Sequence, residues 1–459
     1  MKKGFLIIAM LFGCMMPGLC GVNHLALRDS ILANISGAVI ERSDTVDVTR
    51  FGAKGDGRKD CAWAFAKAIS KMNGRGGGVV NVPKGIFYLR GPINLKSNVI
   101  LHLDKDAILR FDPTPSLYPI VESSWEGTYC FNYSPMIRAY QAVNTGITGT
   151  GLIDGNAMTT FATWKPLQKS AKERSRRINH DETPFTERRF GEGDYLRPQL
   201  IQFYGCSGVT IEGVKIINSP FWCVHLLRSD NIICRGIRYD AKLINNDGID
   251  PESSRNILIE DIFFNNGDDN VAIKSGRDND GRNPMTPPTE NVVIRNCHFK
   301  GLHAVVLGSE LSAGIRNVII ENCDAIGYCK RGLYLKTNPD RGGFVENVSI
   351  SNCTFGNVED LFYITASYAG EGLDNNHFTT IRNISVDGLR ADTVSAAAIV
   401  IQGVPQLPVR DISLRGVAVK SAKIGLSIEH ARDVTFNDCF IGGRVTVPSQ
   451  VSAADNIFK

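Results

Sequence analysis

A short motif that recurs along the second half of the chain limits the fold more than any other sequence feature. Its pattern is Asn-Val-x-Ile-x-x-apolar, and successive copies begin 22 to 36 residues apart. The clear copies begin at Asn231, Asn256, Asn291, Asn317, Asn347, Asn383, Asp411 and Asp433. Each copy is one short alternating β-strand between turn residues. Because no helical pattern of useful length separates the copies, the repeat excludes a βαβ architecture.

A unit of this size cannot bury its own apolar face, so the units must stack on one another. The repeat therefore predicts an all-β solenoid, a parallel β-helix. Equivalent strands of such a stack lie about 4.8 Å apart, and alternate Val, Ile, Leu and Cys side chains fill a continuous core. The Asn at the start of each unit suits a turn position with left-handed backbone angles. A propeller blade needs four strands in about 40 residues, and these units are too short for it.

The composition is that of a globular chain that is not a helical bundle. Hydrophobic residues make up 43% and charged residues 21% of the 459 residues, and 45 glycines with 19 prolines require frequent turns. The formal net charge of +4 is compatible with an acidic ligand but too small for a nucleic-acid-binding surface. We expect a single domain over residues 23–459 and no nucleic-acid partner.

The first residues have the layout of an export signal, which we assign to residues 1–22. Two lysines precede an apolar segment from Phe5 to Phe12, and small residues and cysteines follow. The segment is too short to span a membrane, and no other segment is a candidate span. Residues 11–14 loosely resemble a bacterial lipoprotein cleavage box, so Cys14 is a candidate lipid anchor. The mature protein is expected outside the cytoplasm, in the periplasm or on the surface of a bacterium.

Three segments depart from the repeats. Residues Asp60–Met72 have helical apolar spacing and precede a glycine cluster, which predicts a helix that caps the open end of the solenoid. Residues 156–199 and 277–290 form two inserted loops that could wall a cleft. Between Lys165 and Arg189, eight Lys or Arg stand against four Asp or Glu. We interpret these charges as a solvated surface rather than as substrate contacts.

Four cysteines occupy the same position of the repeat, where sister copies carry Ile, Val or Leu. These are Cys297, Cys323, Cys353 and Cys439. Cysteine acts there as a small apolar core residue, so we expect no disulfide among the four. The sequence does not decide the state of Cys61, Cys130, Cys206, Cys223, Cys234 and Cys329.

Three aspartates stand one repeat interval apart. Asp247 lies in NNDGID, and Asp268 and Asp269 lie in NNGDDN beyond the repeat strand Asn256–Ile262. The two pieces are predicted to occupy nearly equivalent positions on successive coils, about 5 Å apart. Stacked carboxylates repel each other and raise one pKa, which suits general acid–base chemistry better than a structural role. Ordinary turn aspartates and oxygen ligands of Ca²⁺ are the alternatives.

Five separated segments carry a family resemblance. They are Asn245-x-Asp247, Gly267-Asp268-Asp269, Ala272-Ile273-Lys274-Ser275-Gly276, Gly308-Ser309-Glu310 and Arg331-Gly-x-x-x-Lys336. In this order they resemble the polygalacturonase family, family 28 of the glycoside hydrolases, and the similarity covers most of residues 46–440. The resemblance implies a right-handed parallel β-helix that hydrolyses α-linked galacturonic acid units of pectin.

Hydrolysis of a glycosidic bond needs one protonated carboxyl for the leaving oxygen and one carboxylate to activate water. The resemblance implies that Asp268 is the acid, that Asp247 and Asp269 activate the water, and that the anomeric carbon inverts. Coils about 5 Å apart would suggest retention, but backbone spacing does not fix the distance between side-chain oxygens. His303 keeps the family's distance to Gly308-Ser309, without the family's flanking glycines, and is expected in the site. No metal or cofactor is expected.

The resemblance also implies a set of substrate-binding residues. These are Asn245, Lys274, Glu310, Arg331, Tyr334, Lys336 and Arg341. Where the family has Arg-x-Lys, this chain has Tyr334-Leu335-Lys336, so the bidentate fork for a sugar carboxylate is lost unless Arg331 or Arg341 replaces it. Tyr334 would instead offer a stacking face to a sugar ring.

The favoured function is an exo-polygalacturonase that hydrolyses α-1,4-galacturonosyl bonds and whose partner is an acidic plant polysaccharide. The missing arginine keeps a rhamnogalacturonan-backbone galacturonohydrolase as the alternative. A Ca²⁺-dependent pectate lyase and a non-catalytic polysaccharide-binding protein are the alternatives of other classes.

Overall fold

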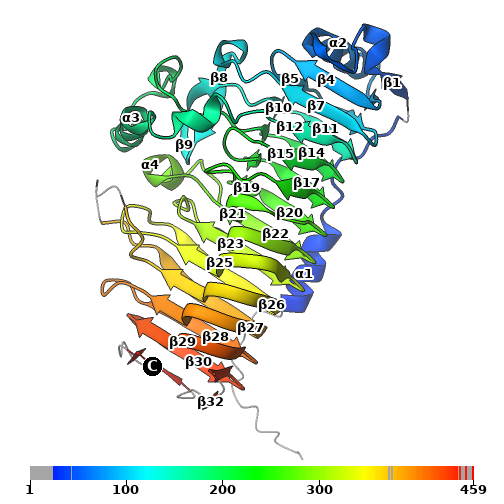
Figure 1. Cartoon of the computed structure of the whole chain (residues 1–459). Helices are drawn as coiled ribbons and strands as arrows, with labels where there is room; N and C mark the ends of the chain where they lie inside the picture. Colours follow the sequence, from blue (N-terminus) through cyan, green and yellow to red (C-terminus); the bar gives the residue numbers. More distant parts are fainter. Residues whose placement is uncertain are drawn as a thin grey trace, which may run out of the picture.

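The computed structural model describes residues 24–442, except 43, 371–372 and 374–375, together with 444–445, 450–451 and 457–458. The chain forms a solenoid of parallel coils (Figure 1), which confirms the predicted parallel β-helix. The predicted export signal and Cys14 lie outside the described residues. Within the described part of the chain, no helix combines the length and apolarity that crossing a membrane requires.

The recurring motif builds one sheet of the solenoid, here called the repeat sheet. The motif residues Asn231 to Asp433 all have φ between 54° and 59°, the left-handed turn expected for them. Their side chains hydrogen-bond along the stack: Asn291 Nδ2 donates to Asn256 Oδ1 at 3.0 Å, and Asn317 Nδ2 donates to Asn291 Oδ1 at 2.9 Å. The strands of the repeat sheet are β1 (Thr45–Asp47), β3 (Gly78–Val82), β6 (Val99–Leu103), β11 (Val143–Gly149), β14 (Ser207–Glu212), β17 (Asp230–Arg235), β20 (Arg255–Glu260), β22 (Thr289–Arg295), β24 (Ile315–Glu321), β28 (Val409–Arg415) and β30 (Ala431–Asn437), with the first halves of β26 (Phe344–Thr365) and β27 (Thr380–Gln402).

Two further ladders complete the coils. The cleft sheet consists of β5 (Ile93–Leu95), β10 (Ile137–Tyr140), β13 (Ile201–Tyr204), β16 (Val224–Leu227), β19 (Ile249–Glu252), β21 (Asn266–Ile273), β23 (His298–Gly308), β25 (Asp324–Lys336), the second halves of β26 and β27, and β29 (Ala418–Glu429). The third ladder consists of β2 (Asp56–Asp60), β4 (Gly85–Leu89), β7 (Ala107–Phe111), β12 (Leu152–Asp154), β15 (Lys215–Ile217) and β18 (Arg238–Asp240). The chain ends in the short strands β31 (Phe440–Ile441), β32 (Arg444–Val445), β33 (Gln450–Val451) and β34 (Ile457–Phe458).

The inward-facing side chains of the three ladders form one continuous apolar core. Cysteines are part of it: all ten cysteines that the structure describes are buried and free. The expectation that Cys297, Cys323, Cys353 and Cys439 form no disulfide with one another is therefore confirmed.

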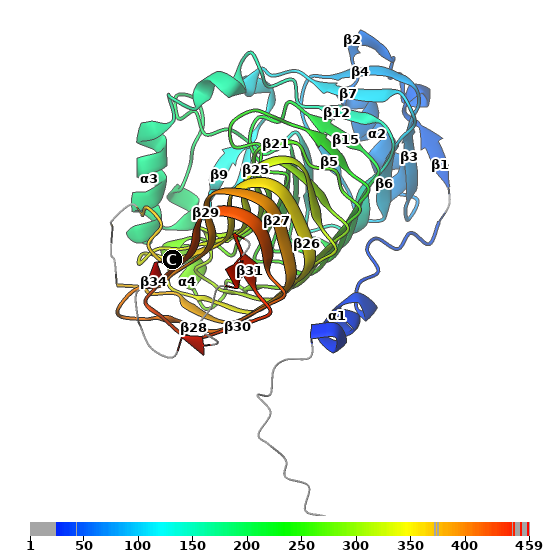
Figure 2. The ribbon, with the colours of Figure 1, turned by 60° about the horizontal axis from the view of Figure 1, so that its bottom comes forward.

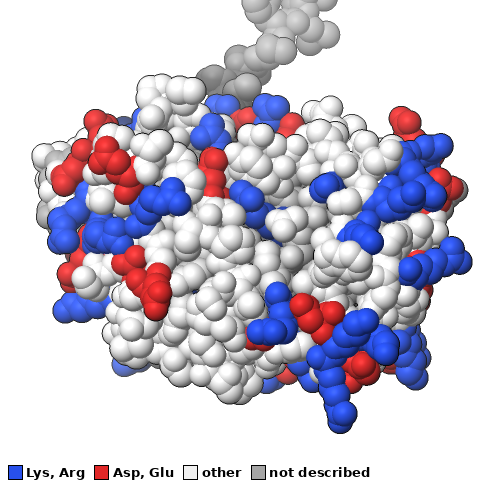
Figure 3. All heavy atoms as spheres, turned by 90° about the horizontal axis from the view of Figure 1, so that it is seen from above, with Lys and Arg blue, Asp and Glu red and all other residues white. Residues whose placement is uncertain are grey.

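Helix α2 (Ala62–Asn73) lies across the first coils and confirms the predicted cap. Its buried side chains, including Phe65 and Met72, join the core of the solenoid. On this capped end, Lys and Arg lie beside Asp and Glu around the rim of the face, and the middle is mostly uncharged with a few charged groups of both signs (Figure 3). The small net charge of the chain is thus not gathered into a patch of one sign on this face.

Helix α1 (His24–Ala33) packs outside the solenoid, on the outer face of the repeat sheet (Figure 2). Its buried Ile31 contacts an apolar cluster that includes Leu258, Val293 and Ile319 of three successive strands. These side chains point away from the core, so α1 covers apolar surface that the coils alone would leave exposed.

The two insertions stand beside the cleft sheet. They contain the 3₁₀ turns η3 (Phe161–Trp164) and η4 (Phe185–Glu187) and the helices α3 (Lys169–His180) and α4 (Asp278–Arg282). The expectation that the charges between Lys165 and Arg189 form a solvated surface is wrong for Arg176 and Arg188, which are buried. Arg176 is paired with Glu126, a residue of another segment, which is the physical reason for its burial.

The cap generates a first prediction. Replacing Phe65, which is 1% exposed and whose ring lies 6.0 Å from that of Phe87, by Ala leaves a cavity at the end of the core. We expect Phe65→Ala to lower the free energy of unfolding by about 3–5 kcal/mol in urea denaturation. The matched control is Trp63→Ala in the same helix, where the side chain is 63% exposed, and the loss should stay below about 0.5 kcal/mol. Equal losses in both variants would show that α2 does not seal the core.

Candidate active site

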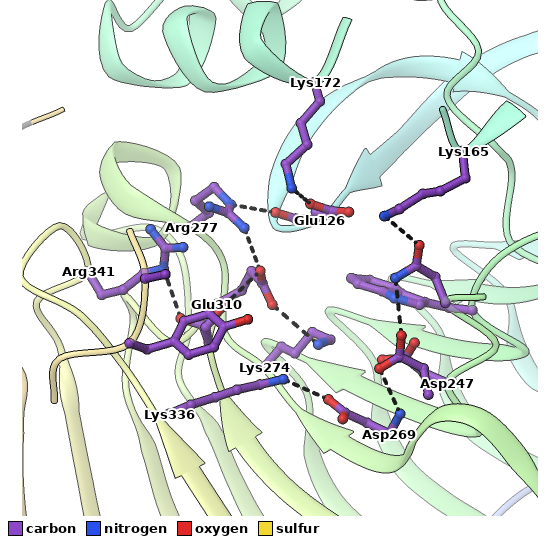
Figure 4. A pocket seen from close by; sticks show the side chains of 16 residues that line it. Glu126, Lys165, Lys172, Asp247, Asp269, Lys274, Arg277, Glu310, Lys336 and Arg341 are labelled. Carbon is purple, nitrogen blue, oxygen red and sulfur yellow. Dashed lines mark hydrogen bonds and ion pairs between the residues drawn. The ribbon is translucent and has the colours of Figure 1, made fainter. Parts of the chain in front are cut away.

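The three aspartates lie on two neighbouring coils of the cleft sheet. Asp268 and Asp269 belong to β21, and Asp247 stands in the turn before β19, whose Ile249 pairs with Val271 of β21. All three line one cavity of about 260 Å³ (Figure 4). Parallel stacking therefore brings together side chains that are 21 positions apart in the sequence.

Eight of the eleven residues singled out from the sequence line this cavity. They are Asn245, Asp247, Asp268, Asp269, Lys274, Glu310, Lys336 and Arg341. The other residues of the lining are Glu126, Lys165, Lys172, Trp222, Arg277, Ser309, Tyr368 and Ala369. Six Lys or Arg and five Asp or Glu therefore surround the cavity, so its wall can balance the charge of an acidic sugar.

Asp269 is the aspartate whose partners are a lysine and a histidine. Its Oδ2 accepts from Lys336 Nζ at 3.0 Å, and its Oδ1 lies 2.6 Å from His303 Nδ1. Burial by itself would raise the pKa of Asp269, but Lys336 and His303 outweigh it and hold this pKa well below its usual range. Asp269 is therefore ionised. Although His303 does not belong to the cavity lining, it contacts the carboxylate from the next coil.

Asp268 has the opposite environment. Its Oδ2 accepts from Asn245 Nδ2 at 3.3 Å, and its Oδ1 accepts from the backbone N–H of Asp269 at 3.1 Å. Burial, followed by the charge of Asp269, raises the pKa of Asp268 above its usual value. Two adjacent carboxyls in one cavity thus have pKa values pushed in opposite directions, the arrangement that separates an acid from a base.

Asp247 is buried beside a further acidic residue, Asp250. Burial, Asp250 and Asp268 together raise the pKa of Asp247 well above its usual value. Asp250, also fully buried, lies 3.6 Å from Lys274 Nζ through its Oδ1. Asp250 was not found from the sequence, although it stands only three residues after Asp247.

Glu310 forms the centre of a cationic cluster in the cavity wall. Lys274 Nζ lies 3.2 Å from its Oε2, and Arg277 donates to its Oε1 at 2.5 Å. Burial would raise the pKa of Glu310, but Lys274, Arg277 and Arg341 outweigh it and lower this pKa well below the usual range. Arg341 is itself anchored, because it donates to the carbonyl of Ser309 at 2.8 Å and lies 2.6 Å from Asp278 Oδ1.

The structure corrects the expected roles of Arg331 and Tyr334. Arg331 Nε pairs with Asp360 Oδ2 at 2.9 Å, outside the cavity lining. Tyr334 is only 5% exposed and packs against Ala272 and Val306, so it offers no open face to a sugar ring. Tyr334 was expected to stack on the substrate. This expectation failed because the motif around Lys336 does not reveal that the tyrosine ring is buried. Tyr368 lines the cavity instead.

One part of the cavity wall is built by the two insertions, which were expected to wall a cleft, and by a hairpin turn that the sequence did not mark as functional. The turn of the hairpin β8 (Ile120–Trp125) and β9 (Thr128–Tyr133) places Glu126 beside Lys172 of α3, with 3.6 Å between the charged atoms. Arg277 holds this turn, because its Nε donates to the carbonyl of Glu126 at 2.8 Å and its backbone N–H donates to that of Gly127 at 3.0 Å. Gly127 has φ +82°, and a Cβ there would lie 2.8 Å from Arg277 Cβ. Only glycine fits this turn.

Basic residues around the hairpin turn keep Glu126 ionised. Burial would raise its pKa, but Arg176, Lys172 and Arg277 outweigh burial and lower the pKa to about 2. The signal that could have revealed this wall was the high density of Lys and Arg in residues 156–199. That signal alone does not distinguish a solvated loop from a cavity wall.

A cation site is the remaining chemical interpretation of the cluster. One ligand atom each of Asp268, Asp269 and His303 lie within 4.8 Å of one another. Lys336 Nζ, however, already neutralises Asp269 at 3.0 Å. Ca²⁺ prefers six to eight oxygen ligands, and these three residues, one of them a histidine beside an ammonium group, do not fit it.

Comparisons with known proteins agree with this geometry. The profile of Glycosyl hydrolases family 28 matches residues 122–439, and that of Rhamnogalacturonase A/epimerase, pectate lyase-like matches residues 45–104. A probable polygalacturonase of Vitis vinifera is 30% identical over 402 residues, which are 84% of this chain and 76% of the relative. An endo-polygalacturonase of Pectobacterium carotovorum subsp. carotovorum is 31% identical over 294 residues, which are 61% of this chain and 65% of the relative.

A solved structure extends the similarity to almost the whole chain. The crystal structure of a hyperthermoactive exopolygalacturonase from Thermotoga maritima superposes with a TM-score of 0.88 and 35% identity, over 95% of this chain and 99% of that chain. The solenoid is thus a right-handed parallel β-helix. Since the family profile covers most of the chain and its site-bearing coils, the chain belongs to Glycosyl hydrolases family 28 and is a polygalacturonase-like glycoside hydrolase.

Proposed function

We propose that the chain is an exo-polygalacturonase that removes galacturonic acid from the ends of pectin chains. The observation that carries this proposal is the pair Asp268 and Asp269, whose pKa values are shifted in opposite directions inside one cavity. The cations around the cavity suit the carboxylate of a uronic acid. The similarity to the Thermotoga maritima exopolygalacturonase supports the same substrate.

Each carboxyl of the pair has one role in the proposed reaction. Asp268, whose pKa is raised, gives its proton to the leaving glycosidic oxygen, and Asp269, which is ionised, takes a proton from the attacking water. Lys336 and His303 keep Asp269 ionised. Asp247 lines the same cavity and is assigned to hold the attacking water beside Asp269, and direct attack of this water inverts the anomeric carbon.

The wall of the cavity supports exo rather than endo action. Glu126 and Lys172 line one end of the cavity, and Arg277 ties the hairpin turn to Glu310 of the cavity wall. A polymer that enters such a site can extend in one direction only, so the bond next to a chain end is the one presented to Asp268.

Rhamnogalacturonan remains the second candidate substrate. The absence of the family's arginine before Lys336 is the observation that favours it, while the burial of Tyr334 removes the proposed stacking surface for a neutral sugar. We place the enzyme outside the cytoplasm, where pectin is found, and a lipid anchor on Cys14 stays a prediction.

Product analysis tests the proposal. The full chain is incubated with polygalacturonate, and the products are separated by anion-exchange chromatography. We expect one small product, galacturonic acid, from the first minutes of digestion. The viscosity of the polymer solution should fall only slowly. A ladder of intermediate oligomers would show endo action, and release from rhamnogalacturonan oligosaccharides alone would favour the second candidate. Unsaturated, chelator-sensitive products would indicate a lyase, and binding without new reducing ends would indicate a non-catalytic protein.

The role of Asp268 has its own test. We expect Asp268→Asn to lower kcat at least about a hundredfold, because the amide cannot donate the proton that the leaving oxygen needs. Asp261→Asn is the matched control, since Asp261 is an exposed turn residue with φ 57° on the far side of the same coil, a backbone angle that Asn also adopts. The control should retain wild-type kcat. Near-normal turnover by Asp268→Asn would refute the assignment.

A further inference from the structure

Asn245 lies between the proposed general acid and the insertion 156–199. It stands in the turn that follows the third ladder, at φ 57°, and its Nδ2 donates to Asp268 Oδ2 at 3.3 Å. An amide can present either its oxygen or its NH₂ group to a neighbour, and the hydrogen bonds around it decide which. The groups that bind the Asn245 amide oxygen therefore decide whether its NH₂ group faces Asp268.

Two cations meet the amide oxygen of Asn245. Lys165 Nζ donates to Oδ1 at 3.0 Å, and a terminal nitrogen of Arg197 donates to the same oxygen at 2.6 Å. Lys and Arg side chains are donors only. A flipped amide would turn its NH₂ group toward both of them, so the two charge-assisted contacts to the amide oxygen would be lost together.

The two cations differ in how firmly they are held. Arg197 is fully buried, donates to the carbonyl of Ile244 at 2.9 Å, and lies 5.0 Å from the ring centre of Phe221. It is a fixed anchor. Lys165 is half-buried and lines the cavity just after η3, so its removal changes the amide contact without opening the packed interior.

We propose that Lys165 and Arg197 are positioning residues that hold the amide of Asn245 with its NH₂ group on the carboxyl of Asp268. The inference rests on the proposed function, in which Asp268 donates the proton. It gives the basic insertion a role in the reaction beyond walling the cavity.

The chemical consequence is that the rise in the pKa of Asp268 is limited. Burial and Asp269 raise the pKa of Asp268, whereas a hydrogen bond from Asn245 and the nearby positive charges favour the ionised carboxylate. The acid then stays protonated before the reaction and still releases its proton to the leaving oxygen. The charged and titratable groups facing Asp268 are Asp247, Asp269, Lys274, His303, Lys336, Lys165 and Arg197.

Lys165→Met tests the proposal in the full chain with polygalacturonate as substrate. We expect kcat to fall by up to about a hundredfold, the loss typical of a misplaced catalytic group, with little change in KM. The basic limb of the kcat profile should move to higher pH, because loss of the cation and of the fixed amide raises the pKa of Asp268. A purely structural residue would not move this limb.

Two matched variants complete the experiment. Lys165→Arg keeps a cationic donor, so its kcat and the basic limb of its pH profile should return toward wild type. Lys169→Met removes a charge from an exposed position of the same insertion, and it should change neither kcat nor the basic limb. If Lys165→Met behaves like Lys169→Met, or if only its KM rises, the positioning role is overturned. A wild-type chain that releases no galacturonate would instead overturn the proposed function, and this is seen before any variant is compared.

Discussion

Parallel stacking of successive coils is the constraint on which the rest of the structure depends. The backbone hydrogen bonds of the cleft sheet and the asparagine ladder of the repeat sheet fix each coil on the previous one. Side chains at equivalent positions of neighbouring coils then lie about 5 Å apart. This spacing joins His303 of β23 to Asp269 of β21, and Lys336 of β25 reaches the same carboxylate.

The stack explains why two adjacent carboxyls acquire different protonation. Asp269 faces later coils, which supply Lys336 and His303, while Asp268 faces Asn245 and the insertion. Burial alone would raise both pKa values, so the difference comes from which neighbours carry charge. A solenoid thus needs no flexible loop to build an acid–base pair. The coils after β21 place Lys336 and His303 on Asp269, and the coil before it places Asn245 on Asp268. The insertions add Lys172 and Arg277 to the cavity wall and supply the contacts of Lys165 and Arg197 to Asn245.

The sequence predicted features that repeat or that are local. The motif beginning at Asn231 predicted the coils, because its apolar period and turn residue act within a few positions, and the interval from Asp247 to Asp268 predicted their proximity. Residues that act through remote contacts were missed: Glu126 and Arg277 meet only when the hairpin folds onto the coils, 151 residues apart in sequence. Tyr334 was misjudged for a related reason, since its burial depends on neighbours from three other coils.

The central claim is that Lys336, from a coil after Asp269, holds this carboxyl ionised, and the pH dependence of kcat/KM in Lys336→Met tests this claim most directly. Loss of a cation at 3.0 Å raises a depressed carboxyl pKa. We predict that the acidic limb moves to higher pH and that Lys336→Arg, which keeps the charge, returns it toward wild type. The basic limb should move less, because Lys336 acts on Asp268 without contacting it. An acidic limb at the wild-type position in Lys336→Met would contradict the claim.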